Sequence, residues 1–243
     1  MQTKTQNFRA GLRDGLPICL GYFAVSFAFG IQAAGIGLSV PEAAAVSAAN
    51  LTSAGQFAAL GIIAAGASYL ELAFTQLVIN LRYFLMSCAL SQRLSPDMRF
   101  AHRFGIAYGM TDEIFAVSFS RPAPLSPYYS YGLIAAAVPG WVLGTTLGAA
   151  AGSILPGVLT NALGIALYGM FIAIVVPPAK ENRVVAGVAL LSMAVSAVFT
   201  FAPYLREISS GFRIILVTVL VAGGAAWLFP IEDKPVKEED HAA

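Results

Sequence analysis

The sequence predicts an all-α polytopic membrane protein with about seven or eight transmembrane segments, some of them broken or re-entrant. Of its 243 residues, 58% are hydrophobic and only 11% are charged, whereas a soluble domain carries about 25% charged residues. The charges are also segregated, because stretches such as 15–41, 43–70 and 122–179 contain none. About 20 apolar residues cross the hydrocarbon core, so each stretch can hold at least one span. Alternating strand patterns are absent, which favours helices over a barrel.

Eight apolar segments follow one another along the chain: 16–37, 41–67, 69–90, 104–120, 129–153, 159–179, 184–202 and 212–229. Proline and glycine separate them, as expected of residues that break helices. No linker is long enough to divide the chain, so residues 1–243 are predicted to form a single transmembrane domain. Within it we expect a cytoplasmic N-terminus over 1–13 and a solvated tail over 231–243. The halves 14–120 and 128–229 are similar enough in length to allow an inverted repeat.

The positions of the basic residues conflict with eight simple crossings. Three of them precede the first segment and place the N-terminus in the cytoplasm by the positive-inside rule: Lys4, Arg9 and Arg13. Three more favour the same side but follow the third segment, where three crossings would place them outside: Arg93, Arg99 and Arg103. A re-entrant or broken segment near residues 41–90 or 104–120 would resolve this conflict.

A glycine recurs every four residues in the fifth segment, immediately after Pro139. Gly140, Gly144, Gly148 and Gly152 therefore share one nearly straight helix face, where another backbone can approach closely. We expect this face to pack against another helix of the same chain, in preference to a dedicated partner interface.

The stretch "NLTSAGQF", residues 50–57, interrupts an otherwise apolar segment with hydrogen-bonding groups. The small residues around Gly55 allow the helix to unwind, and the freed backbone groups are tolerable at membrane depth only against protein or a water-filled cavity. Transporters use such breaks to hold substrates. The alternative is interhelical hydrogen bonding by Asn50, Thr52 and Gln56, at about 0.6 kcal/mol each.

Two further apolar segments carry charges. Arg82, within "VINLRYFLMS", costs about 2.5–3.5 kcal/mol at a span centre unless it finds an anion or reaches an interface. In "AYGMTDEIFAVSF", Gly109 is expected to end one helix, and Thr111 or Asp112 to cap the next. Asp112 and Glu113 lie about 100° apart on a helix. Both side chains can therefore face the same point only if the backbone breaks there. The structural alternative is that one acid neutralises Arg82 in a salt bridge, and this alternative does not account for the second acid.

The sequence offers no catalytic, metal or cofactor motif. Nucleophile elbows, paired His–Glu zinc motifs, phosphate loops and Cys/His clusters are all absent. Cys19 and Cys88 both fall inside apolar segments, as buried thiols do. No basic cluster is dense enough to indicate nucleic-acid binding. We therefore expect neither an enzyme nor a cofactor. We expect the chain to be surrounded by the lipid bilayer.

Four pieces of the sequence, in this order and spacing, carry a resemblance to a known family. They are "GLRDGLPICLGYFAVSFAFGIQAAGIGLS", the stretch from Ser47 to Phe57 ending in Gln-Phe, "NLRYFLMS" and "GMTDEIFA". Over about residues 11–120, and more loosely beyond, the chain resembles the AzlC family of branched-chain amino-acid permeases. The resemblance implies a multi-pass transporter of the bacterial inner membrane that moves branched-chain amino acids outward. It also implies a small hydrophobic partner subunit of the AzlD type.

The leading functional hypothesis is a secondary transporter that exports leucine, isoleucine, valine or similar apolar amino acids. The candidate substrate-binding residues are Ser53, Gly55, Gln56, Asn80, Arg82, Thr111, Asp112 and Glu113. An acid of the fourth segment would bind the substrate ammonium, and Arg82 or N–H groups freed near residues 53–55 would bind its carboxylate. Two alternatives stay open: a transporter of another small solute with the same fold, and a non-transporting membrane subunit that assembles through the glycine face.

Overall fold

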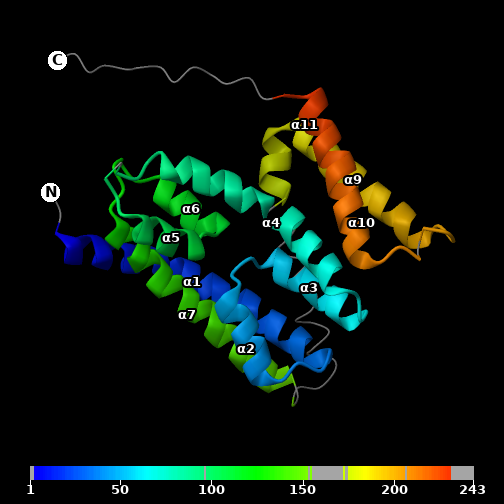
Figure 1. Ribbon diagram of the computed structural model, residues 1–243, viewed down its shortest axis with the longest axis horizontal. Helices are drawn as coiled ribbons and strands as arrows, with labels where there is room; N and C mark the ends of the chain where they lie inside the picture. The colour runs from blue at the N-terminus through cyan, green and yellow to red at the C-terminus, as the bar shows by residue number, and fades with distance from the viewer. Residues whose placement is uncertain are drawn as a thin grey trace.

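A computed structural model describes residues 3–95, 97–152, 154, 172, 175–205 and 207–230. Its helices are α1 (Lys4–Gly35), α2 (Val40–Ala49), α3 (Ala54–Ala64), α4 (Tyr69–Ser91), α5 (Phe100–Tyr108), α6 (Asp112–Phe119), α7 (Pro127–Gly152), α9 (Arg183–Phe201), α10 (Ser210–Val217), η1 (Thr218–Gly223) and α11 (Gly224–Leu228). The only β-type pairing in the described residues is an isolated bridge between Leu94 and Leu125. The predicted all-α class is confirmed (Figure 1).

Five helical stretches among the described residues are long and apolar enough to cross a membrane: Lys4–Gly35, Tyr69–Ser91, Pro127–Gly152, Arg183–Phe201 and Ser210–Leu228. They coincide with five predicted segments, so the polytopic membrane class is confirmed as well. The predicted segment 159–179 lies mostly outside the described residues, and the tail 231–243 entirely so. Thr3 caps α1, so the helix begins at Lys4, ahead of the predicted first apolar segment.

The predicted glycine face packs against α1. A side chain added at any of its four glycines would collide with or crowd α1. The α1 residues that it would meet are Cys19 at Gly140, Phe23 at Gly144, Phe27 at Gly148 and Ile31 at Gly152. The contacts advance in the same order along both helices, so α1 and α7 run parallel and side by side (Figure 1). The expectation of packing within the chain is confirmed.

The predicted segment 41–67 is a re-entrant hairpin. Ala43 of α2 and Leu60 of α3 lie in one buried cluster with Ala33 and Ala149, near the ends of α1 and α7. The turn between the two helices, residues 50–53, packs instead with residues from the middle of α1. The chain therefore enters from the end where α1 finishes, turns halfway, and returns to the same end.

The predicted segment 104–120 is a second re-entrant hairpin, and it enters from the other end. α5 begins where His102 contacts the start of α7. At the turn, the Thr111 hydroxyl oxygen lies 2.5 Å from that of Tyr22, in the middle of α1. α6 then runs back, so that Arg121 forms an ion pair with Asp14 near the start of α1.

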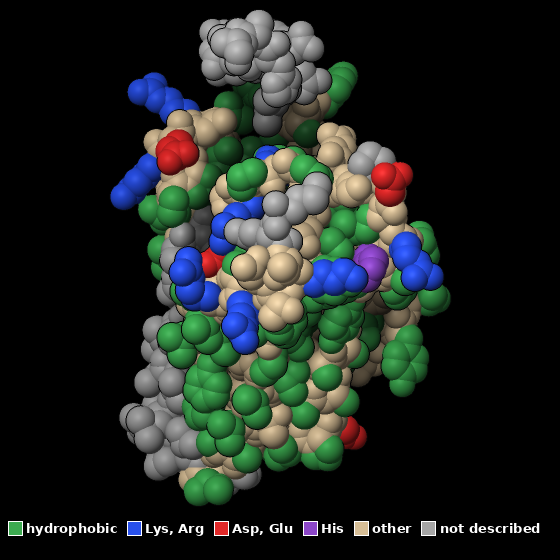
Figure 2. Space-filling model, turned by 90° about the vertical axis from the view of Figure 1, so that its left-hand side faces the viewer, with side chains coloured by type: hydrophobic (Ala, Val, Ile, Leu, Met, Phe, Trp, Pro, Cys, Tyr) green, Lys and Arg blue, Asp and Glu red, His purple; other side chains and the backbone are tan. Residues whose placement is uncertain are grey.

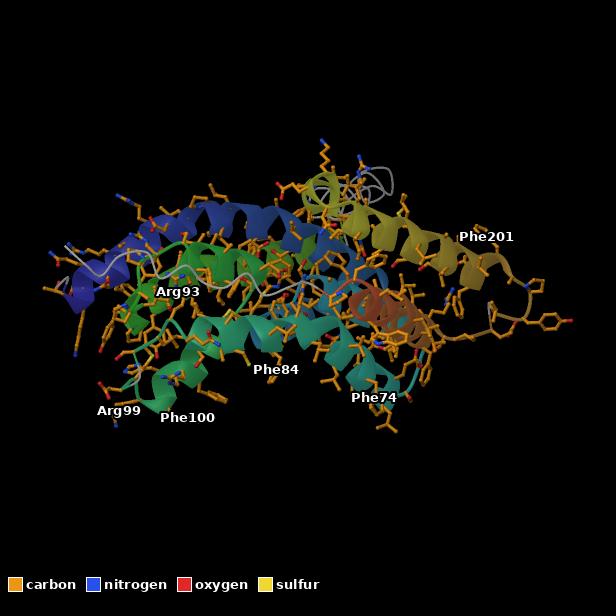
Figure 3. All side chains as sticks on the ribbon, turned by 90° about the horizontal axis from the view of Figure 1, so that it is seen from above. Phe74, Phe84, Arg93, Arg99, Phe100 and Phe201 are labelled. Carbon is orange, nitrogen blue, oxygen red and sulfur yellow. The ribbon has the colours of Figure 1, made fainter. Side chains whose placement is uncertain are left out.

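These hairpins resolve the conflict among the basic residues. Because the α2–α3 hairpin does not cross, α1 and α4 are two successive crossings, and the loop after α4 returns to the end where α1 begins. Arg93 donates a 2.6 Å hydrogen bond to the Arg121 carbonyl at this end. Figure 2 shows Lys and Arg side chains gathered on this end face, and Figure 3 places Arg93 and Arg99 there, away from Phe74 and Phe201. We call it the basic end.

The two hairpins belong to a pair of inverted units. Helices of 10, 11 and 23 residues (α2, α3, α4) are followed by helices of 9, 8 and 26 residues (α5, α6, α7). In each unit a hairpin precedes a span, and the two units run in opposite directions. The boundary between them lies after α4 and not near residues 120–128, where the predicted halves met.

A buried carboxylate joins the C-terminal helices to α4. Glu71, in the first turn of α4, accepts hydrogen bonds from the Gly211 N–H at 3.0 Å and from the Ser209 hydroxyl. Both donors lie at the start of α10, so Glu71 complements the positive end of that helix. α10 meets α4 at the end opposite the basic one, and α9 packs on α10.

Candidate functional site

A cavity of about 790 Å³ lies where the tips of the two hairpins meet. Its lining residues are Pro17, Ile18, Gly21, Tyr22 and Val25 of α1; Leu51, Ser53 and Ala54 of the first tip; Arg82 and Tyr83 of α4; Thr111, Asp112, Glu113, Ala116 and Val117 of the second; Trp141 of α7; and Val175. Tyr22, Arg82 and Trp141 stand near the middle of their helices. The cavity is therefore central to the spans.

The tips also contact each other directly. The Tyr108 hydroxyl, at the end of α5, donates a 2.5 Å hydrogen bond to the Ala48 carbonyl, at the end of α2. Each tip ends one helix and begins the next, so two helix N-termini, those of α3 and α6, start beside the cavity. The partial positive charge of a helix N-terminus favours anions.

The first tip holds a strained residue. Ser53 has φ 47° and ψ −87°, which makes it the one non-glycine residue with positive φ among those described. Residues held in such conformations cost about 1–3 kcal/mol and concentrate at functional sites. Before it, the Asn50 carboxamide oxygen accepts from the Thr52 N–H at 3.0 Å, which closes the end of α2. The predicted helix break in "NLTSAGQF" is thus present, and it places Ser53 on the cavity.

Gln56 supports this tip from behind the cavity wall. Its side chain is fully buried, and its carbonyl oxygen accepts a 2.9 Å hydrogen bond from Trp141 Nε1. Its amide nitrogen donates to the Val46 carbonyl at 3.2 Å and to the Ser47 hydroxyl at 3.3 Å. These contacts correspond to the interhelical alternative for Gln56. The structure does not bring this predicted binding residue to the cavity.

Gly55 and Asn80 also lie outside the lining. The Gly55 carbonyl accepts a 2.7 Å hydrogen bond from Gln76 Nε2, and Asn80 donates to Gln76 Oε1 at 3.1 Å. A side chain at Gly55 would come within 2.6 Å of Gln76 Oε1 and closer still to Thr52. The glycine therefore permits α3 to lie close against α4.

The second tip brings both predicted acids to the cavity. Gly109 ends α5, and the Thr111 hydroxyl caps α6 by accepting from the Ile114 N–H at 3.3 Å. Both features were predicted. Asp112 and Glu113 occupy the first turn of α6. Because the helix begins there, the two carboxylates diverge toward different partners around one cavity.

Asp112 pairs with Arg82. Arg82 Nη1 lies 2.8 Å from Asp112 Oδ2, and the two side chains are 37% and 34% exposed. The guanidinium also stacks over the Tyr83 ring at 4.9 Å and donates to its hydroxyl at 3.1 Å. The predicted salt bridge between the third and fourth segments is present, and it lines the cavity.

Glu113 contacts a different kind of partner. Its Oε2 accepts a 2.6 Å hydrogen bond from the Tyr22 hydroxyl, which also contacts Thr111. Among the described residues, no Lys, Arg or His forms an ion pair with it. Glu113 is also exposed, in contrast to the buried Tyr22.

Sequence reasoning missed Tyr22 and Trp141. The two rings meet edge to face, 5.3 Å apart, and form one wall of the cavity. Tyr22 is the single tyrosine in the first apolar segment, and this position is a sequence signal because a phenol at membrane depth needs a hydrogen-bond partner. Trp141 follows Gly140 directly and lies about 100° around α7 from it, on the side of the helix that faces Gln56.

The α6 lining residues, from Asp112 to Val117, extend from the second tip toward the basic end. On the other side of the tips, Ser47 and Thr145 form a buried hydrogen bond of 2.7 Å. Beyond it, the Phe29 and Phe57 rings pack edge to face at 5.4 Å.

The fold and the site define a polytopic helical membrane protein with two opposed re-entrant hairpins around a central polar cavity. Broken helices around such a cavity are a feature of membrane transporters. The chain belongs to the AzlC family, because the family model described as AzlC protein matches residues 17–155, which include both hairpins. The predicted family is confirmed, and membership is consistent with a membrane transporter.

Two curated relatives match most of the chain. An "Uncharacterized membrane protein" of Archaeoglobus fulgidus is 34% identical over 188 residues, which cover 76% of this chain and 82% of the relative. "Inner membrane protein YgaZ" of Escherichia coli K12 is 29% identical over 201 residues, 80% of this chain and 82% of the relative. No solved structure matches the chain significantly.

Proposed function

We propose that this AzlC-family chain is a secondary transporter of the bacterial inner membrane that exports leucine, isoleucine, valine or similar apolar amino acids. The observation that carries the proposal is the central cavity, which combines carboxylates, a guanidinium and two helix N-termini with apolar walls. Its volume falls within the usual range of about 300–1,000 Å³ for small-molecule sites.

The chemistry of the cavity suits a zwitterion. Glu113 offers a carboxylate that pairs with no cation among the described residues, and it can accept hydrogen bonds from a substrate ammonium. The substrate carboxylate can bind Arg82 or the N-terminus of α3 at residues 53–54. Ile18, Val25 and other aliphatic lining residues would contact the side chain. Discrimination among aliphatic substrates should be weak, since one methylene is worth about 1–3 kcal/mol.

We further propose that a small hydrophobic subunit of the AzlD type assembles with this chain. The support is the resemblance that the sequence carries to AzlC/AzlD-type exporters. Large apolar side chains such as Leu190, Met193 and Trp227 are exposed on the C-terminal helices, and in a membrane such surfaces face lipid or another helix.

A transporter of a different small solute is the second candidate. The same cavity would suit another amino acid or a small organic anion, because Arg82 and the helix N-termini bind any carboxylate. The third candidate, a subunit that assembles through the glycine face, has less support. α1 already covers that face.

Counterflow of labelled leucine into liposomes tests the proposal. Purified protein, reconstituted with any co-encoded small membrane subunit, should accumulate label against an internal pool of unlabelled leucine. Asp112→Asn leaves Arg82 without its carboxylate and should reduce the initial rate about tenfold or more. Glu42→Gln, an exposed acid in the first turn of α2, should keep the wild-type rate.

Two results would contradict the proposal. If the wild-type protein accumulates other labelled solutes but no leucine, isoleucine or valine, the substrate assignment is wrong. If Asp112→Asn inserts normally and transports leucine at the wild-type rate, the ion pair in the cavity plays no part in transport.

A further inference from the structure

A groove of about 230 Å³ lies between α4 and α5 at the basic end. α4 contributes Leu90 and Ser91 to its lining, and α5 contributes Arg103, Phe104 and Ala107. The groove shares no lining residue with the cavity between the hairpin tips. It is therefore a second, separate site on the molecule.

The groove follows α5 from the basic end toward the second tip. Phe100, exposed in the first turn of α5, lines its outer end, and Met110, directly before the Thr111 cap, lines its inner end. α5 has 9 residues and is therefore about 14 Å long at 1.5 Å per residue. One leaflet of a bilayer is half of a hydrocarbon core of about 30 Å. The groove thus reaches about as deep as one lipid leaflet.

A guanidinium held by the protein stands at the outer end of the groove. Arg103 donates from Nη1 to the Ser91 hydroxyl at 2.7 Å and from Nη2 to the Ser95 carbonyl at 3.0 Å. Its Nε donates a longer bond, of 3.5 Å, to the Met98 carbonyl. A guanidinium has five N–H donors, so the contacts within the described residues leave two donors for a further acceptor.

The positive charge at this point is not balanced by a carboxylate. Among the described residues, Arg93, Arg99 and Arg103 form no ion pair. The groove lining contains no acid, and neither does the first turn of α5. Arg99 is exposed and precedes Arg103 by one helical turn, so both guanidinium groups can reach the same anion. Figure 3 places Arg99 beside Phe100 at this end.

We propose that this groove binds an anionic phospholipid, with its phosphate on Arg99 and Arg103 and one acyl chain along α5. By the positive-inside rule the basic end faces the cytoplasm, and basic pockets between helices on that side bind anionic head groups. The phosphate complements the two arginines, and the acyl chain complements the apolar lining. A soluble anion would use the arginines alone.

A lipid in this position would hold α5 against α4. Its chain would contact Met110, which is buried and lies next to the cap of α6. It would therefore support the second tip from the side opposite the substrate cavity. The inference does not depend on which solute the protein transports.

Native mass spectrometry of the full-length protein in detergent tests the inference. The probes are phosphatidylglycerol and phosphatidylcholine with identical acyl chains. Wild-type protein should retain one phosphatidylglycerol, and at least about fivefold less phosphatidylcholine, because only the anionic lipid has a net charge that complements the arginines.

Three variants locate the bound lipid. Arg99→Gln and Arg103→Gln should each reduce the retained phosphatidylglycerol about fivefold or more. Ala107→Phe keeps both charges but fills the groove, and should reduce it by a similar factor. Arg9→Gln is the matched control, because Arg9 is an exposed arginine of α1 at the same end and lies outside the groove. It should retain the wild-type amount.

Four outcomes would overturn the inference. The first is equal retention of the two lipids, and the second is wild-type retention of phosphatidylglycerol by Arg99→Gln or Ala107→Phe. These two variants also decide the matter if Arg103→Gln fails to fold. The third is displacement of the lipid by glycerol 3-phosphate, which would indicate a site for soluble anions. The fourth is a dimer that Ala107→Phe dissociates without any effect on lipid, which would assign the groove to a second copy of the chain.

Discussion

At the scale of single residues, the structure separates polar side chains that line the cavity from those that hold it together. Ser53, Arg82 and Glu113 face the cavity, whereas Gln56 is buried behind it and bonded to Trp141. Both kinds look alike in the sequence, since each is a polar residue in an apolar stretch. The difference arises because the partner of Gln56 lies 85 residues further along the chain, which no local pattern reveals.

The link between Trp141 and Gln56 should contribute measurably to stability. Trp141→Phe removes the Nε1–H donor and leaves the fully buried carboxamide oxygen of Gln56 without it, a loss of about 1–3 kcal/mol. We expect a lower midpoint of thermal unfolding in detergent. The chain's other tryptophan, Trp227, is 85% exposed, so Trp227→Phe should leave the midpoint nearly unchanged. Equal midpoints for the two variants would show that the hydrogen bond is not important.

At the scale of helices, the break positions and the glycine face could be predicted because their causes are local. Small and polar residues favour a turn at residues 50–53, a glycine followed by a cap favours one at 109–111, and a four-residue glycine spacing makes one smooth face. The direction in which each broken segment continues could not be predicted. It depends on whether the second arm of each hairpin, α3 or α6, returns to the end of the molecule at which the first arm began. That choice is made by packing against α1 and α7.

The α1–α7 seam makes a prediction about helix packing. Gly144→Leu should disrupt it, because any side chain at this position meets the backbone of Phe23. We expect loss of the monodisperse folded protein in size-exclusion chromatography. Gly187 is the matched control: it is a helical glycine in α9 with no other atom near its missing side chain, so Gly187→Leu should be tolerated. Normal behaviour of Gly144→Leu would mean that the two helices do not pack as described.

At the scale of the whole molecule, two inverted units place hairpin tips from opposite ends against each other at the centre of the spans. The Tyr108–Ala48 contact joins the tips, and the cavity lies beside this junction, toward the basic end. The conflict among loop charges had predicted a re-entrant segment, because two crossings before Arg93 restore the positive-inside rule. The charges could not indicate that both broken segments are re-entrant, since the residues in conflict, Arg93, Arg99 and Arg103, all lie before the second hairpin or in its first turn.

Protection of a cavity cysteine by leucine tests the central claim, that substrate binds between the two tips. In a chain carrying Cys19→Ala and Cys88→Ser, Ala116→Cys introduces one thiol on the cavity wall of α6. A membrane-impermeant thiol reagent added at the basic end should label it, and leucine should slow the labelling. Ala65→Cys, exposed at the far end of α3, should react independently of leucine when the reagent is added at that opposite end. Labelling of Ala116→Cys that leucine leaves unchanged would contradict the account.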